Sequence, residues 1–197
     1  MFADISLAIL AGGKNSRFHG FNKSFIKLGD KRVIDYQIDF FKEIFPEIII
    51  VTNDAELYSE FDNVKTVCDA YSEIGPLAGI DAALTHTSFH KIFVISCDMP
   101  FFNKELFFQL IHSSDNEEFD IHILSVKGKI QPLFGIYFKK IYSDLKKLIE
   151  GPDKKSVMKL IENLNSNIIE IQNEELNPLD FYNINSPFDL KILRDKI

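Results

Sequence analysis

Short apolar runs alternate with amphipathic stretches along the first half of the chain, and this alternation restricts its fold more than any other feature. Four runs have the length and composition of buried strands: residues 6–10, 48–51, 64–67 and 91–96. Between the first two, residues 33–45 carry apolar side chains at steps of four, three and four, which predicts one buried helix face: Ile34, Ile38, Phe41 and Phe45. Strands joined by helices form β-α-β crossovers, and these require a mostly parallel sheet covered on both faces. We therefore predict an α/β fold, a Rossmann-like three-layer α/β/α sandwich.

The second half adds elements to this sheet. Two strand-like runs, 121–127 and 130–138, are expected to join it as a pair. Helices are expected at four further places and at the end of the chain: residues 78–87, a helix capped by Asn103, 140–150, 156–164, and a helix from Pro187 capped by Ser186. No stretch has the composition of a linker, so residues 1–197 are predicted to form a single domain with two halves, about 1–102 and about 103–197.

Charge and cysteine content restrict the partners and the compartment. The chain has 22 basic and 29 acidic residues and a net charge of −7, which argues against binding nucleic acid. Cys68 and Cys97 match neither a disulfide framework nor a zinc spacing. The apolar runs are far shorter than the roughly 18 residues of a membrane span, and the first residues lack the basic segment of a secretion signal. We expect a cytoplasmic protein without a membrane anchor.

The loop after the first strand is rich in glycine and cationic residues. It begins Leu10-Ala11-Gly12-Gly13, and no acidic residue occurs between Asp4 and Asp30. Adjacent glycines let a backbone approach a phosphate, and this interval supplies the compensating charge: Lys14, Arg17, Lys23 and Lys27. The spacing fits neither a P-loop nor a dinucleotide-binding motif. The loop predicts a small anionic ligand, and an ordinary turn with exposed cations is the alternative.

Three other segments follow predicted strands at the edge where an open parallel sheet binds ligands. Asp98 follows the strand 91–96, where a carboxylate suits Mg²⁺, although it could also cap a helix. Asp69 follows the strand 64–67 in the same way. Gly75 and Gly79 frame a glycine-containing run suited to close backbone contact with a base or ribose. Cys97 is expected to be a packed side chain and not a nucleophile.

Taken together, these motifs resemble the molybdenum cofactor guanylyltransferases, which are MobA-type nucleotidyltransferases. The resemblance rests on ordered segments that span nearly the whole chain: Leu10-Ala-Gly-Gly with Arg17, Gly20 and Lys23, Gly75-Pro-Leu-Ala-Gly79, Cys97-Asp98-Met-Pro100, Gln131-Pro132-Leu-Phe-Gly135 and Asn183-Ile-Asn185. It implies a fold like that of the nucleotide-diphospho-sugar transferases. The implied reaction transfers GMP from GTP to the phosphate of molybdopterin, or Mo-molybdopterin, with Mg²⁺ as cofactor and release of pyrophosphate.

The resemblance also assigns roles to individual residues. Lys23, Arg17 and Asp98 would be catalytic, and Asp98 would also bind the metal. The nucleotide would be bound by Leu10, Ala11, Gly12, Gly13, Lys23, Asn53, Asp69, Gly75, Gly79 and Asp98. The half from 1 to about 102 would bind the nucleotide and the half from about 103 the pterin. The match is loose at Phe18 and in the short spacer between Asp69 and Gly75.

The acceptor site is less well defined by sequence. The resemblance places it in the second half, where polar and cationic candidates occur: Gln131, Pro132, Asn183, Asn185, Lys154 and Lys155. Further implied partners are molybdenum-insertion proteins and chaperones of apo-molybdoenzymes, and the chain would be a monomer or a weak homo-oligomer. Three alternatives remain open: a cytidylyltransferase acting on the same pterin, a sugar-1-phosphate nucleotidyltransferase, and a non-catalytic nucleotide-binding adaptor.

Overall fold

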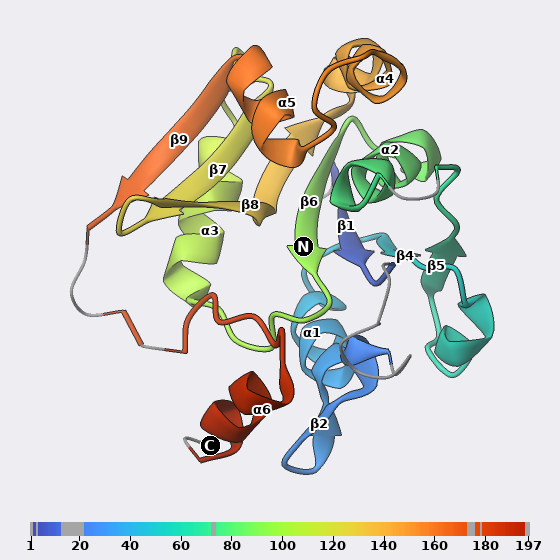
Figure 1. The fold of residues 1–197 in the computed structure, drawn as a ribbon, viewed down its shortest axis with the longest axis vertical. Coiled ribbons are helices and arrows are strands. Elements are labelled where there is room, and N and C mark those ends of the chain that lie inside the picture. The colour runs from blue at the N-terminus through green and yellow to red at the C-terminus, as the bar shows by residue number, and fades with distance from the viewer. Residues whose placement is uncertain are drawn as a thin grey trace.

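The central sheet has strand β1 (Ile5–Leu10) near its middle (Figure 1). The computed structural model describes residues 2, 4–12, 22–71, 74–172, 176–177 and 179–195. Within these residues the sheet has seven strands in the order β5-β4-β1-β6-β8-β7-β9. The other strands are β4 (Ile48–Val51), β5 (Val64–Val67), β6 (Lys91–Ser96), β7 (Ile121–Val126), β8 (Lys129–Phe138) and β9 (Ser166–Ile171).

The sheet is mostly parallel, as the alternating pattern predicts. Strand β1 pairs in parallel with β4 and β6, β4 with β5, and β7 with β9. Strand β8 runs antiparallel to both of its neighbours, β6 and β7. The predicted pair of strands in the second half therefore does join the sheet, and the sheet continues through both halves of the chain. Strand β9 at the sheet edge was not predicted.

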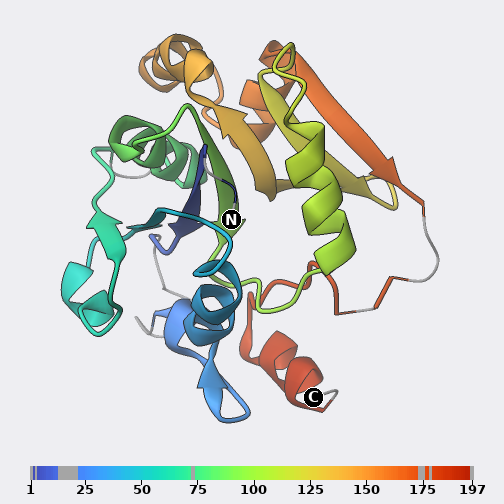
Figure 2. The ribbon, with the colours of Figure 1, turned by 180° about the vertical axis from the view of Figure 1, so that it is seen from behind.

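Helices cover both faces of the sheet. They are α1 (Val33–Phe41), α2 (Pro76–His86), α3 (Lys104–Ser113), α4 (Tyr142–Glu150), α5 (Val157–Asn163) and α6 (Pro187–Arg194). Side chains of α1 and α3 share one buried cluster with Leu7 and Ile9 of β1, whereas α2, α4 and α5 share another with Ala8 and Leu10. Figure 1 shows α2 and α5 in front of the sheet, and Figure 2 shows α3 on the other side. The structure confirms the three-layer arrangement.

Short elements complete the chain around the layers. The 3-10 helices are η2 (Lys23–Phe25), η3 (Ala55–Tyr58) and η4 (Lys139–Ile141), and a small hairpin consists of β2 (Lys27–Leu28) and β3 (Lys31–Arg32). Helix α6 lies beside this hairpin, where the Arg194 guanidinium donates to the Lys27 carbonyl at 3.2 Å. No helix within the described ranges is both long and apolar enough to cross a bilayer.

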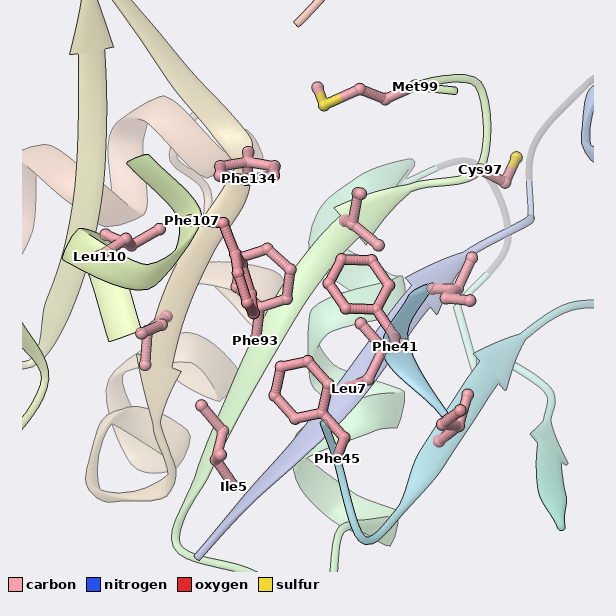
Figure 3. Close-up of a cluster of buried hydrophobic side chains, with 14 of the residues drawn as sticks. Ile5, Leu7, Phe41, Phe45, Phe93, Cys97, Met99, Phe107, Leu110 and Phe134 are labelled. Carbon is pink, nitrogen blue, oxygen red and sulfur yellow. The ribbon is translucent and has the colours of Figure 1, made fainter. Parts of the chain in front are cut away.

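Aromatic side chains fill the core on the α1 and α3 face (Figure 3). The ring of Phe93 on β6 is at their centre, with its centroid 5.1 Å from that of Phe107 and 5.0 Å from that of Phe134. Phe41 and Phe45 contact the same ring at 5.7 and 5.9 Å. Such ring pairs add roughly 0.5 to 1.5 kcal/mol each beyond the area they bury. This packing makes β6, which carries Asp98 beyond its end, a rigid support.

Helix ends differ from the predicted boundaries for local reasons. Helix α1 ends at Phe41 and not at Phe45, although Phe45 still packs in the core with 2% of its surface exposed. Helix α2 begins at Pro76, two residues before the predicted start, because Pro is favourable at the first helical position. Helix α4 begins at Tyr142, since the residues before it form η4. The predicted caps are confirmed: Asn103 accepts from the Leu106 N–H and Ser186 from the Asp189 N–H.

Candidate functional site

The segments that follow four parallel strands meet at one edge of the sheet. Backbone hydrogen bonds continue beyond the ends of these strands: Ala11 N–H to Val51 O at 2.9 Å, Thr52 N–H to Val67 O at 2.8 Å, and Cys97 N–H to Leu10 O at 3.1 Å. These bonds bring together the ends of β5, β4, β1 and β6. The predicted site residues Gly12, Asn53, Asp69 and Asp98 therefore lie along a single edge.

Lys23 and Asp98 form an ion pair at this edge. The Lys23 Nζ lies 3.0 Å from Asp98 Oδ2, with side chains that are 19% and 14% exposed. The same ammonium donates to Asn185 Oδ1 at 3.2 Å. The ammonium of Lys23 thus contacts one residue that follows β6 and one that precedes α6. Both partners of the ion pair keep some surface exposed to solvent.

The Asp98 carboxylate is held in place by its own neighbours. Ser96 Oγ donates to its Oδ1 at 2.6 Å, and the Asp98 carbonyl accepts from the Ile184 N–H at 2.9 Å. Beneath the turn, the buried Gln37 amide donates to the carbonyls of Ser96 and Met99 at 2.8 and 2.9 Å. These bonds fix the turn and orient the carboxylate toward Lys23.

Gly12 and Asp69 face each other at the ends of β1 and β5. A Cβ atom at position 12 would lie 3.6 Å from Asp69 Oδ2 and 3.9 Å from the Val51 carbonyl. Any larger side chain would occupy the space beside the carboxylate. Glycine keeps that space open, as close approach of a ligand to this backbone requires.

Asn53 and Cys68 are joined at the same edge. The Cys68 thiol donates to Asn53 Oδ1 with a sulfur–oxygen distance of 2.9 Å, and both residues are exposed. Cys68 immediately precedes Asp69, so this contact links the segment after β4 to the segment after β5. The structure places Asn53 with the other candidates, and its contact with a nucleotide stays a prediction.

The two glycines of the run from Gly75 to Gly79 have conformational roles. Gly75 has a φ of 72° at the N-terminal end of α2, a left-handed conformation that other residues rarely adopt. A Cβ on Gly79 would lie 3.1 Å from Leu10 Cδ2, so this glycine lets α2 pack closely on β1. These roles account for both residues without a ligand, and their contact with the nucleotide stays a prediction.

Some candidates from the first loop lie outside the described residues. These are Gly13 and Arg17, together with Lys14 and Gly20 of the same loop. Leu10, Ala11 and Gly12 lie within the described part, where Leu10 and Ala11 are buried at the end of β1. The predicted catalytic role of Arg17 therefore stays a prediction.

Only some of the residues predicted to form the acceptor-substrate site lie near Lys23. Asn185 contacts it directly, and Asn183, two residues earlier, has a buried Oδ1 without a hydrogen-bond partner. Gln131 and Pro132 lie on β8, which runs antiparallel to β6 and so enters the sheet from this edge. Lys154 and Lys155 are exposed between α4 and α5. Within the described ranges, no hydrogen bond or ion pair joins these two lysines to the Lys23–Asp98 pair.

Asp98 has the donor chemistry of a magnesium ligand. Its Oδ2 accepts from Lys23, and its side chain keeps 14% of its surface exposed, so the carboxylate remains partly open to a cation. The part of the chain that the structure describes contains no group of three or more acidic, histidine or cysteine side chains able to hold a metal. Mg²⁺ needs only one or two carboxylates when phosphates and waters complete its octahedron. The residues fit a cation that is bound together with its phosphate ligand.

Cys97 beside Asp98 is not a nucleophile. Burial, and secondarily the Asp98 carboxylate, raises the pKa of its thiol to about 12. The thiol is therefore neutral at physiological pH, and a neutral thiol reacts poorly. The structure confirms the predicted packing role: Cys97 belongs to the buried cluster of the α1 and α3 face (Figure 3).

Sequence reasoning did not find two residues that orient the site. Ser96 is the last residue of β6, and Gln37 is a fully buried polar residue in the middle of α1. Gln37 acts through contacts with residues about 60 positions away, and Ser96 acts through the neighbouring Asp98 carboxylate. The available signal for Gln37 was a polar residue next to the apolar stripe of its helix.

Comparison with known proteins supplies the family. A family profile described as "MobA-like NTP transferase domain" matches residues 7–168. A protein of Clostridium perfringens named "Probable molybdenum cofactor guanylyltransferase" is 38% identical over 189 residues, which cover 92% of this chain and 91% of that protein.

Solved structures agree on the fold. "Molybdopterin-guanine dinucleotide biosynthesis protein A" from Archaeoglobus fulgidus superimposes with a TM-score of 0.80 at 25% identity and covers 97% of both chains. A 2-C-methyl-D-erythritol 4-phosphate cytidylyltransferase from Thermus thermophilus reaches a TM-score of 0.71 at 12% identity, covering 98% of both chains. A similar fold thus occurs in proteins named for guanine and for cytidine nucleotides.

Proposed function

This chain belongs to the family of MobA-like NTP transferase domains, and from that premise we propose that it transfers GMP from GTP to the phosphate of molybdopterin or Mo-molybdopterin. In this reaction an oxygen of the pterin phosphate attacks the α-phosphorus of GTP. The bond from that phosphorus to the bridging oxygen of the β-phosphate breaks, and pyrophosphate leaves. The product is a guanine dinucleotide form of the cofactor.

The observation that carries the proposal is the Lys23–Asp98–Asn185 cluster at the sheet edge. Attack of one phosphate on another brings two anions together, so the enzyme must supply positive charge and hold both groups in line. Lys23 is a cation that two other segments, through Asp98 and Asn185, hold at the carboxyl ends of β1 and β6. We assign it to the phosphates of GTP, where it would offset negative charge on the departing pyrophosphate.

Asp98 would have two roles. In the free enzyme it orients the Lys23 ammonium across 3.0 Å. With the substrate present, Asp98 would hold Mg²⁺, which would neutralise negative charge on the phosphates. Asp69, beside the open space at Gly12, is assigned to the nucleoside part of GTP, together with Asn53. No covalent intermediate on the protein is needed, because the acceptor phosphate is itself the nucleophile.

Acceptor binding is assigned to the second half of the chain. Asn185 contacts the ammonium that we assign to the nucleotide, so a group bound by Asn185 would lie next to the phosphates. Asn183, two residues before it, is assigned to the pterin as well; its Oδ1 is buried and has no hydrogen-bond partner. We also propose that the enzyme works in the cytoplasm, where GTP is available, and that its product passes to molybdenum-insertion proteins or to chaperones of apo-molybdoenzymes.

A turnover assay tests the function. Pyrophosphate release is measured with GTP and with CTP, each with and without molybdopterin. We expect release that requires both GTP and the acceptor, because a site that bonds to the guanine edge leaves polar groups unpaired with another base. Equal rates with CTP would replace the guanylyl assignment with a cytidylyl one. Tight GTP binding without pyrophosphate release would indicate a nucleotide-binding adaptor.

A further inference from the structure

Asn22, Ser24 and Tyr58 form a closed ring of three hydrogen bonds next to Lys23. The Asn22 amide Nδ2 donates to the Tyr58 hydroxyl at 3.1 Å, and Ser24 Oγ donates to Asn22 Oδ1 at 2.8 Å. The third side of the ring joins Ser24 Oγ and the Tyr58 hydroxyl at 2.7 Å. Two of its members are the immediate neighbours of Lys23 in the chain, whereas Tyr58 comes from η3.

Proton counting fixes the direction of each bond. A serine hydroxyl has a single proton, and that of Ser24 goes to Asn22 Oδ1, which can only accept. Ser24 must therefore accept from Tyr58, so the tyrosine hydroxyl both donates to Ser24 and accepts from Asn22. Within the ring each group donates one hydrogen bond and accepts one. Such a ring is cooperative, so the loss of one member weakens the other bonds.

The ring is buried and rigidly supported. Tyr58 is 2% exposed and Ser24 is fully buried. Burial raises the pKa of the Tyr58 hydroxyl, which therefore keeps the proton that the ring requires. The aromatic rings of Tyr58 and Phe25 pack with their centroids 5.2 Å apart, and the Arg32 guanidinium lies 5.1 Å from the Phe25 centroid. The hydroxyl is thus fixed by contacts that do not involve Lys23.

This support bears directly on the direction of the Lys23 side chain. Asn22 also caps η2, because its Oδ1 accepts from the Ser24 N–H at 3.1 Å. The backbone is therefore held immediately before and immediately after Lys23. A lysine side chain is long and flexible, and a fixed backbone reduces the number of directions its ammonium can take. In the structure that direction leads to Asp98 and Asn185.

We propose that Tyr58 is a positioning residue: its hydroxyl closes the ring that holds the backbone around Lys23 and so directs the Lys23 ammonium toward the phosphates of the bound nucleotide. The inference rests on the proposed function, in which Lys23 binds those phosphates. It adds Tyr58 and Ser24, which the sequence motifs did not indicate. It also predicts that their effect reaches the phosphates and not the base.

Calorimetric titration of Tyr58→Phe with GTP and with guanosine tests the inference. The substitution keeps the aromatic packing and removes the hydroxyl alone. We expect the affinity for GTP to fall about three- to tenfold, the scale of one or two lost hydrogen bonds, and the affinity for guanosine to stay unchanged. Tyr36→Phe is the matched control, because it removes a hydroxyl that donates to the Leu28 carbonyl at 2.9 Å; its GTP affinity should equal that of the wild type.

Ser24→Ala opens the same ring from another side and provides the second variant. It should reproduce the selective loss of GTP affinity, and the double variant should lose little more than either single one, because the ring is already open. Lys23→Met separates the inference from its premise. If Lys23→Met weakens GTP binding while Tyr58→Phe and Ser24→Ala do not, or if these two weaken GTP and guanosine equally, the positioning role is wrong. If Lys23→Met leaves GTP binding unchanged, the assignment of Lys23 to the phosphates fails.

Discussion

Replacing Asp98 by Asn should abolish transfer and leave the fold nearly intact. The change conserves volume and keeps one oxygen, but it removes the carboxylate charge that faces Lys23. The Coulomb attraction across the 3.0 Å contact is about 5 to 6 kcal/mol at an effective dielectric of about 20. Desolvation offsets most of this, and the remaining amide oxygen still accepts a hydrogen bond. The net loss of unfolding free energy should be about 1 kcal/mol, a fall in Tm of about 2 to 4 °C.

The effect on turnover should be much larger. Removal of one preorganised electrostatic group at a reacting centre typically lowers kcat by about 100- to 1000-fold, or roughly 3 to 4 kcal/mol. The assay is steady-state pyrophosphate release at saturating GTP and Mg²⁺, with circular dichroism and thermal melting on the same preparations. A loss of that size with a small change in Tm would place the carboxylate in the chemistry.

Asp81→Asn is the matched control for this experiment. Asp81 pairs with Lys146 at 2.8 Å, and its side chain is 4% exposed, so the pair resembles Lys23–Asp98 but lies between α2 and α4. The control should lose at least as much stability as Asp98→Asn and keep its turnover. Wild-type turnover with unchanged Mg²⁺ dependence in Asp98→Asn would refute the metal role and leave Asp98 only as the partner of Lys23.

Three further predictions follow from contacts in the structure. Lys23→Met should weaken GTP binding by about 1.5 to 3 kcal/mol, the scale of a hydrogen bond to a charged group, and titration calorimetry would measure it. Gly79→Ala adds a Cβ that would lie 3.1 Å from Leu10 Cδ2, a crowding cost set against a helix-propensity gain of about 1 kcal/mol; in denaturant titrations Gly79→Ala combined with Leu10→Ala should therefore lower the unfolding free energy by less than the sum of the single changes. Burial lowers the pKa of His122 below its usual 6.5, so as the pH falls the unfolded chain binds a proton at this residue before the folded chain does. The unfolding free energy should therefore decrease as pH falls below about 6.5, by at most about 1.4 kcal/mol per pH unit, and an equal slope in His122→Gln would contradict this.

Much of the fold could be predicted from local patterns. Strands such as β6 are continuous apolar runs, and helices such as α3 have a cap and one apolar face, so periodicity and flanking residues identify them. Strand β9 escaped prediction because its pairing with β7 is non-local and its residues are only partly buried. The hairpin of β2 and β3 has two residues in each strand, which is too short for any periodicity.

The site could be predicted in its location but not in its contacts. Parallel strands imply a common edge, and this predicts that Asp69 and Asp98 lie at the same edge of the sheet. The contact between Lys23 and Asn185 joins residues 162 positions apart, and no local pattern encodes it. Gly79 differs from these residues. Its motif predicts a contact with the nucleotide, and the structure shows in addition that a glycine here allows close packing on Leu10.

The central claim is that the α-phosphate of GTP, with its nucleoside, passes to the pterin phosphate. GTP labelled at the α-phosphate or at the γ-phosphate, incubated with the enzyme, Mg²⁺ and molybdopterin, tests it directly once the products are separated. The account predicts that the α-label appears in the pterin dinucleotide and the γ-label in pyrophosphate. Recovery of the γ-label on the pterin, or as inorganic phosphate with the α-label still in GDP, would contradict it.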